Sequence, residues 1–170
     1  DCDRKKVGKL IAAFLAKSQM NFWMSREQCK VYTDYFPFIT NNTVLSSVFS
    51  DSTLEYLSGL NTKEKNEKWI ILDSPSWIKG KEKAIAYAEE HNLEYELVWG
   101  LQHKQLLDKL AKSKGLIFLP LGHDTCPRIV IEAKILGCEL ILNDYVQHKD
   151  ELWFNTVTSV YDHLYTRGEV

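Results

Sequence analysis

The sequence Trp69-Ile70-Ile71-Leu72 is an uninterrupted apolar run that follows the polar and charged stretch 61–68. A run without alternation is typical of a strand that is buried on both faces of a sheet. Similar strand-like runs follow at 95–99, 115–119 and 139–142, and stretches with helical spacing of apolar residues lie at 81–91, 103–113, 128–136 and 150–165. This alternation predicts an α/β fold, a Rossmann-like open parallel sheet with helices on both faces.

The segment before residue 61 is less regular and predicts a smaller, separate part. Apolar residues recur at helical spacing over 4–18, and residues 20–24 are typical of a short buried strand. Ser25 is a plausible N-cap for a helix that ends before Pro37, and residues 44–49 are again strand-like. The chain starts without Met and stops abruptly, so we expect it to be a fragment of a longer protein.

Composition excludes several classes of protein. The chain has 170 residues and a net charge of −2, which offers no global basic field for nucleic acid or an anionic membrane. No apolar run approaches the roughly 20 residues that span a bilayer. The cysteines are scattered, which favours free thiols in a reducing compartment over a zinc site or a disulfide scaffold. We therefore expect a cytoplasmic protein without a metal site; the cysteines are Cys2, Cys29, Cys126 and Cys138.

The loop after the first strand of the regular part, residues 73–80, has neither a dinucleotide fingerprint nor a P-loop. It does place Lys79 and Gly80 directly before a helix. Lys79 could reach a phosphate held at the N-terminus of that helix. The alternative is a solvated lysine in a stretch that also contains Lys81 and Lys83.

The loop after the third strand, residues 120–127, is richer in polar side chains. Asp124 or Thr125 can cap the following helix, and Glu132 then interrupts a dense apolar run within it. The carboxylate of Glu132 must face solvent, pair with Arg128 one turn earlier, or meet a ligand at the edge of the sheet. A catalytic triad is a weak hypothesis, because His123 and Asp124 are adjacent and no nucleophile elbow accompanies them.

Taken together, residues 68–145 resemble the C-terminal, donor-binding half of a GT-B glycosyltransferase of the retaining, group-1 type. Residues 77–80 match the Lys-Gly of that family before its first helix, and residues 103–120 match its helix and strand ending at Pro. Residues 124–141 resemble its Glu-x7-Glu block, with the following Ala, Gly turn and strand. The upstream segment is similar to the end of the family's N-terminal domain, so residues 1–60 are expected to be that tail and 61–170 the nucleotide-sugar-binding domain.

The resemblance implies an enzyme of carbohydrate biosynthesis that needs no cofactor or metal. Glu132 would hold the ribose hydroxyls of the donor, since a carboxylate accepts two hydroxyl hydrogen bonds. Asp124, in place of the first Glu, and Lys79 would act in catalysis by contacting the donor sugar and the diphosphate. The remaining donor-binding residues would be Gly80, Gly122, His123, Thr125 and Cys126. The partners implied are a nucleotide-diphosphate sugar and a saccharide or other acceptor held by an N-terminal domain missing from this chain.

Three departures from the family pattern leave other functions open. Asp73 stands where the family often has Arg, Pro127 replaces a flexible Gly, and residues 143–145 replace a Gly-Gly pair. Proline removes one N–H donor from the expected diphosphate site. One alternative is therefore a catalytically inactive GT-B-like binding or scaffolding module, and the other is a GT-B-fold sugar-nucleotide epimerase.

Overall fold

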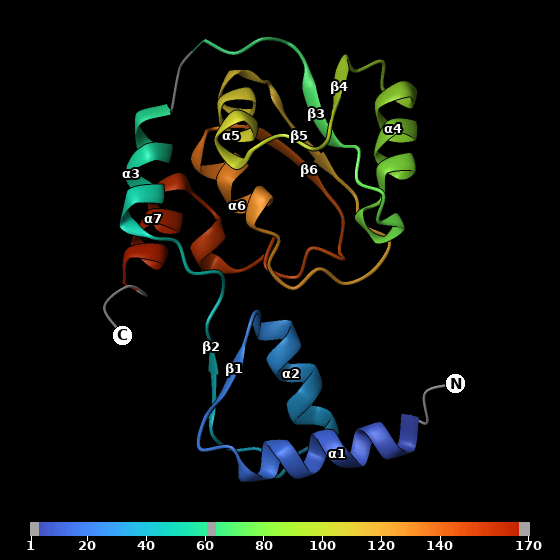
Figure 1. The fold of residues 1–170 in the computed structure, drawn as a ribbon, viewed down its shortest axis with the longest axis vertical. Coiled ribbons are helices and arrows are strands. Elements are labelled where there is room, and N and C mark those ends of the chain that lie inside the picture. Colours follow the sequence, from blue (N-terminus) through green and yellow to red (C-terminus); the bar gives the residue numbers. More distant parts are fainter. Residues whose placement is uncertain (1–3, 61–63, 167–170) are drawn as a thin grey trace. The chain divides into compact units, whose positions relative to one another are not determined.

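The computed structural model describes residues 4–60 and 64–166. Its internal contacts divide the chain into two units, Asp1–Ser46 and Ser47–Val170 (Figure 1). The prediction that residues 1–60 are the tail of another domain stays a prediction. No helix within the described ranges has both the length and the apolar character needed to cross a membrane.

The first unit is built on a two-stranded parallel sheet whose strands pair Asn21 with Asn42 and Trp23 with Val44. Trp23 is buried, and its indole N–H donates to the side-chain oxygen of Asn42 at 2.8 Å. Ser25 caps the second helix as predicted, because its hydroxyl accepts from the backbone N–H of Gln28. The elements are α1 (Arg4–Lys17), β1 (Asn21–Trp23), α2 (Arg26–Tyr35) and β2 (Asn42–Val44).

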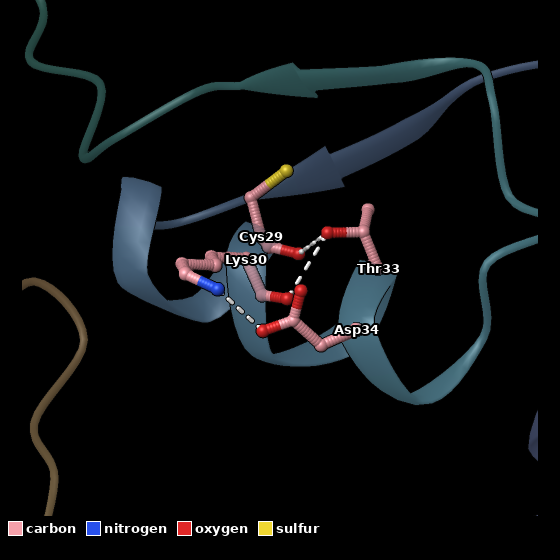
Figure 2. Close-up of polar contacts among 4 residues, drawn as sticks. All are labelled: Cys29, Lys30, Thr33 and Asp34. Carbon is pink, nitrogen blue, oxygen red and sulfur yellow. Dashed lines mark hydrogen bonds and ion pairs between the residues drawn. The ribbon is translucent and has the colours of Figure 1, made fainter.

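Figure 2 shows polar contacts along α2. Lys30 forms an ion pair with Asp34 one turn later, and both side chains are largely exposed. The Thr33 hydroxyl lies 3.0 Å from the carbonyl oxygens of Cys29 and of Lys30, so it can donate back to the preceding turn. An exposed ion pair of this kind contributes at most about 0.5 kcal/mol.

The second unit is organised around a four-stranded sheet in the order β4-β3-β5-β6, and every neighbouring pair is parallel. This confirms the predicted α/β fold with an open, Rossmann-like parallel sheet. Its elements are α3 (Asp51–Leu60), β3 (Trp69–Leu72), α4 (Lys81–Glu90), β4 (Tyr95–Val98), α5 (His103–Lys112), β5 (Gly115–Phe118), α6 (Arg128–Ile135), β6 (Glu139–Leu142) and α7 (Val157–Tyr165), with short 3-10 helices at Trp77–Lys79 and Leu152–Phe154.

Helices cover both faces of this sheet, as the unbroken apolar strands predict. Ile71 and Ile117 pack under α4 on one face, and the neighbouring Ile70 and Leu116 belong to a larger core on the other. That larger core is covered by α3, α5, α6 and α7, whereas α4 stands alone on its side of the strands (Figure 1). Burial of both faces therefore explains why the strands lack polar alternation.

The structure corrects two predicted elements and adds one that was not predicted. The strand expected at 44–49 is wrong, because β2 ends at Val44 and residues 45–49 have no regular strand structure; Phe49 is buried there, whereas Val48 is exposed. Helix α3 was not predicted, although it contributes Leu54 and Leu57 to the core. The last helix begins at Val157 and not at residue 150, since Thr156 and Ser159 form a reciprocal capping box there.

Candidate functional site

The carboxyl ends of β3 and β5 lie at the point where the strand order reverses. β3 has β4 on one side and β5 on the other. The connection through α4 covers one face of the sheet, and the connection through α5 covers the other (Figure 1). Open parallel sheets bind ligands in the crevice between loops that diverge in this way. The residues that follow Leu72 and Phe118 are therefore the first candidates for a site.

Gly80 brings the loop after β3 against the end of β5. Its φ is +71°, and a Cβ placed on it would lie 1.9 Å from the carbonyl oxygen of Leu119. Next to it, the N–H of Leu121 donates to the carbonyl oxygen of Ile78 at 2.9 Å. Only glycine combines the left-handed backbone with so close an approach. The two loops of the crevice are thus held together at Gly80, and Gly122 lies over the Ile78 side chain.

Lys79 and Asp124 face each other across this crevice. The Lys79 ammonium lies 2.8 Å from Oδ2 of Asp124, and their side chains are 37% and 20% exposed. The sequence predicted each of them as a site residue, and the structure brings them together although 45 positions separate them. The charge of Lys79 is therefore already partnered in the absence of a ligand.

A second loop holds the backbone around Asp124. The N–H of Asp124 donates to the carbonyl oxygen of Tyr145 at 2.7 Å, and its carbonyl oxygen accepts from the N–H of Gln147. The ring of His123 meets Tyr145 edge-on at 5.3 Å. The loop after β6 thus braces the loop after β5, and the Asp124 carboxylate is held in position from the backbone side.

Asp73, at the end of β3, carries an ion pair with Lys81 in the first turn of α4, with 2.9 Å between the charged atoms. The hydrogen bond and the charge of Asp73 raise the pKa of the Lys81 ammonium. An unpaired carboxylate here, where the family often has Arg, would repel a bound diphosphate. The neighbouring ammonium offsets that repulsion.

Glu132 lies in the second turn of α6 and is only 3% exposed. Its Oε1 atom lies 2.8 Å from Nε2 of His103, the first residue of α5. Burial on the apolar face of α6 excludes the solvent-facing alternative considered from the sequence. His103 itself was not predicted, because no pattern in the sequence indicates that the start of α5 meets α6.

Arg128 does not pair with Glu132, so that alternative is wrong as well. Its guanidinium lies 4.5 Å from the ring centroid of Phe49, in the segment before α3. Arg128, His103 and Glu132 together line an open cavity of about 320 Å³. The buried carboxylate, an imidazole and a guanidinium therefore surround one space at the N-terminal ends of α5 and α6.

An apolar pocket of about 350 Å³ lies beside these helix ends, at the carboxyl ends of β3 and β4. It shares both helices with the cavity, since Leu106 follows His103 by one turn and Ile129 follows Arg128 directly. This pocket was not predicted; the apolar residues Trp99 and Leu101, at the end of the predicted strand 95–99 and just after it, are the signal in the sequence that could have indicated it. Its lining is Leu72, Val98, Trp99, Gly100, Leu101, Leu106 and Ile129.

The turn into α6 differs from the expected one. Pro127 occupies the N-cap position, and no side chain caps the helix there, so the predicted capping by Asp124 or Thr125 is wrong. Asp124 instead pairs with Lys79. The carbonyl oxygen of Cys126 accepts from the Ser47 hydroxyl at 3.3 Å, and burial raises the pKa of the Cys126 thiol. A thiolate nucleophile at this position is therefore disfavoured.

No family model, curated protein or solved structure matches this chain. The candidate site therefore rests on its own geometry. Within residues 4–60 and 64–166, no group of three or more His, Cys, Asp or Glu side chains is arranged to hold a metal ion. What the site does offer is an ion pair at the strand crossover, a buried carboxylate at a cavity and an adjoining apolar pocket.

Proposed function

We propose that the second unit binds a nucleotide-diphosphate sugar and acts as the donor-binding half of a glycosyltransferase. The observation that carries the proposal is the carboxylate of Glu132, which is buried and yet lines a cavity between α5 and α6. A buried carboxylate is costly unless hydrogen-bond donors surround it. His103 supplies one donor, and the two hydroxyls of a ribose would supply the others.

The apolar pocket supports the nucleotide part of this proposal. It lies next to the Glu132 cavity along α5 and α6, and its lining is almost entirely apolar. The flat faces of a nucleobase make no hydrogen bonds, so they would lose none on entering an apolar pocket. The exposed Trp99 ring could stack on the base. With a base in this pocket, the attached ribose would fall at Glu132.

Lys79 and the first turn of α6 would receive the diphosphate. The N-terminus of a helix attracts anions, and this one has no capping side chain. A diphosphate would compete with Asp124 for the Lys79 ammonium and release the Asp124 carboxylate toward the hydroxyls of the sugar. Cations and N–H donors placed there would stabilise the departing nucleotide diphosphate, the main electrostatic demand of the transfer.

The acceptor and the cellular setting belong to the same proposal. The acceptor, a saccharide or another hydroxyl compound, would be held by a further domain, as the resemblance to retaining GT-B enzymes implies. The described cysteines, Cys29, Cys126 and Cys138, are unpaired thiols, which supports a reducing compartment, and we place the protein in the cytoplasm. Cys2 lies outside the described residues.

Titration calorimetry of the chain with UDP, GDP and ADP tests this proposal. We expect one of them to bind, and we expect Glu132→Ala to lower its affinity at least tenfold, since a buried acceptor for the ribose is lost. The matched control is Glu139→Ala, which removes an exposed carboxylate and should leave the affinity unchanged. If none of the three nucleotides binds at millimolar concentration, the proposal is wrong.

A binding module without catalysis is the second candidate, and two observations favour it. The Lys79 ammonium is already paired with Asp124, and Pro127 offers no N–H at the start of α6. Both features weaken the stabilisation of a leaving diphosphate. Nucleotide binding without release of free sugar from UDP-, GDP- or ADP-sugars, in the presence of the acceptor domain, would support this candidate over the enzyme.

A further inference from the structure

The first helix concentrates positive charge in a chain that is acidic elsewhere. α1 contains no acidic residue, whereas the whole chain has a net charge of −2. Net charge alone predicted no attraction to an anionic surface, but such attraction acts over about 10 Å and depends on local charge. The basic residues of the helix are Arg4, Lys5, Lys6, Lys9 and Lys17.

The same helix exposes an apolar stripe. Val7, Leu10 and Phe14 are 39%, 64% and 72% exposed. Their spacing of three and four residues places them on one face of the helix. Ile11 and Leu15, on the neighbouring face, are partly buried in the first unit. The stripe is therefore additional to the face by which α1 packs.

Lysines lie at both ends of this stripe. Lys6 precedes Leu10 by four residues, and Lys17 follows Phe14 by three, so both continue the same row along the helix. A lysine stem can lie along an apolar surface while its ammonium extends away from it. The face thus combines apolar side chains with cations at their border.

We propose that α1 binds in the plane of an anionic lipid bilayer. Its apolar stripe would enter the boundary of the acyl chains, and its lysines would meet the anionic headgroups. An RNA would neutralise the lysines but leave Leu10 and Phe14 in water. A second copy of the chain would cover the stripe but bring two basic helices together. An anionic lipid surface satisfies both features, and the 14 residues of α1 are too short to span it.

Vesicle flotation of the whole chain tests this surface. We expect the protein to float with phosphatidylcholine vesicles that contain about 30% phosphatidylserine, and not with phosphatidylcholine alone. The bound fraction should fall when the salt is raised to about 0.5 M, because screening weakens the attraction. Binding does not depend on nucleotide, so it is independent of the function proposed for the second unit.

Two double variants with matched controls separate the contributions of charge and apolar contact. Lys9→Glu/Lys17→Glu should weaken binding at least about 25-fold, since each lysine near an anionic surface contributes about fivefold. Lys83→Glu/Lys112→Glu makes the same charge change on exposed lysines of the second unit and should have little effect. Leu10→Asn/Phe14→Asn removes the apolar contact without a change of charge and should abolish flotation, whereas Leu97→Asn/Leu152→Asn, at two exposed leucines of the second unit, should not.

Several results would overturn the proposal. It is wrong if the chain does not float with the anionic vesicles, or if the Lys9→Glu/Lys17→Glu and Lys83→Glu/Lys112→Glu pairs weaken binding equally. It is also wrong if the chain forms a dimer that Leu10→Asn/Phe14→Asn dissociates, because the stripe would then be covered by a second copy. Circular dichroism of each variant shows whether the fold is retained, which is expected because the substituted side chains are exposed.

Discussion

The Nε2 atom of His103 lies 2.8 Å from Oε1 of Glu132, which joins the start of α5 to the second turn of α6. The Glu132 side chain is 4% exposed and that of His103 is 51% exposed. An ionised carboxylate only accepts hydrogen bonds, so with Glu132 ionised this bond requires the His103 tautomer that carries its proton on Nε2. The structure gives Oε2 of Glu132 no hydrogen-bond partner among the described residues, and Glu132 lines the cavity. His103 thus holds one oxygen and leaves the other for a ligand.

We expect His103→Phe to lower the free energy of unfolding by about 1–3 kcal/mol, because it leaves a buried carboxylate without its donor. Glu132→Gln should lose less, since the amide oxygen can still accept from His103. The double variant His103→Phe/Glu132→Leu should regain stability relative to His103→Phe alone, because both polar partners are then removed. Urea unfolding measures all three, and a His103→Phe protein as stable as the wild type would contradict the role of this bond.

The ion pair between Lys79 and Asp124 predicts an unusual direction of change for ligand affinity. Asp124→Asn leaves the Lys79 ammonium without its carboxylate, so a diphosphate no longer has to displace it. We expect UDP, GDP or ADP, whichever binds, to bind about fivefold more tightly, and Lys79→Met to bind it more weakly by a similar factor. Calorimetry measures both changes.

The control for this prediction is Asp34→Asn, which breaks the exposed ion pair of α2 shown in Figure 2. Like Asp124→Asn, it removes one carboxylate charge, but it does so in the first unit, and it should leave nucleotide affinity unchanged. Weaker binding by Asp124→Asn would mean that the Asp124 carboxylate is needed to hold the Lys79 ammonium in place for the diphosphate, and the proposed exchange of partners would be wrong.

Strands β3 and β5 could be predicted because their burial on both faces leaves a continuous apolar run, as in residues 69–72. Helix α3 could not, since only Leu54 and Leu57 of its ten residues are fully buried. So short an apolar stripe is a weak signal. The opposite error occurred after Val44, where apolar residues predicted a strand that is not present. Phe49 is buried in the core without belonging to a strand.

The sequence could predict several residues of the candidate site, but not which of them contact each other. Lys79, Asp124 and Glu132 stand in the loops and helix that a parallel sheet uses for ligands. Which of these side chains contact each other depends on which strands are neighbours in the sheet, and no local sequence pattern predicts that order. β5 lies beside β3, which brings Asp124 to Lys79, and the packing of α5 against α6 brings His103 to Glu132.

His148 predicts how stability depends on pH. It is fully buried, and neither ring nitrogen has a hydrogen-bond partner in the part of the chain that the structure describes. Its ring stacks on Trp153 at 5.4 Å and meets Phe154 edge-on at 4.6 Å. Burial disfavours the charged imidazolium and lowers its pKa from 6.5 to about 4.

Between pH 6.5 and about 4 the unfolded chain therefore binds a proton at His148 that the folded protein does not. Stability from this residue is fully present above pH 6.5 and is lost as the pH falls toward 4, by about 3 kcal/mol in total. We expect the free energy of unfolding, measured with urea, to depend less on pH across this range in His148→Phe than in the wild type. The control His91→Phe, at an exposed histidine, should keep the pH dependence of the wild type. Equal slopes for His148→Phe and the wild type would refute this assignment.

Gly80 and Gly100 separate the cost of a left-handed backbone from the cost of close packing. Their φ angles are +71° and +69°, but an added Cβ meets the Leu119 carbonyl oxygen at 1.9 Å at Gly80 and nothing within 4 Å at Gly100. Gly100→Ala should therefore cost only the backbone term, about 1–2 kcal/mol. Gly80→Ala must also push the loop after β3 away from β5, and we expect a loss of about 3 kcal/mol or more. Urea unfolding compares the two variants. Equal losses in the free energy of unfolding would mean that the loop after β3 moves away from Leu119 without cost, and the predicted penalty for close packing at Gly80 would be wrong.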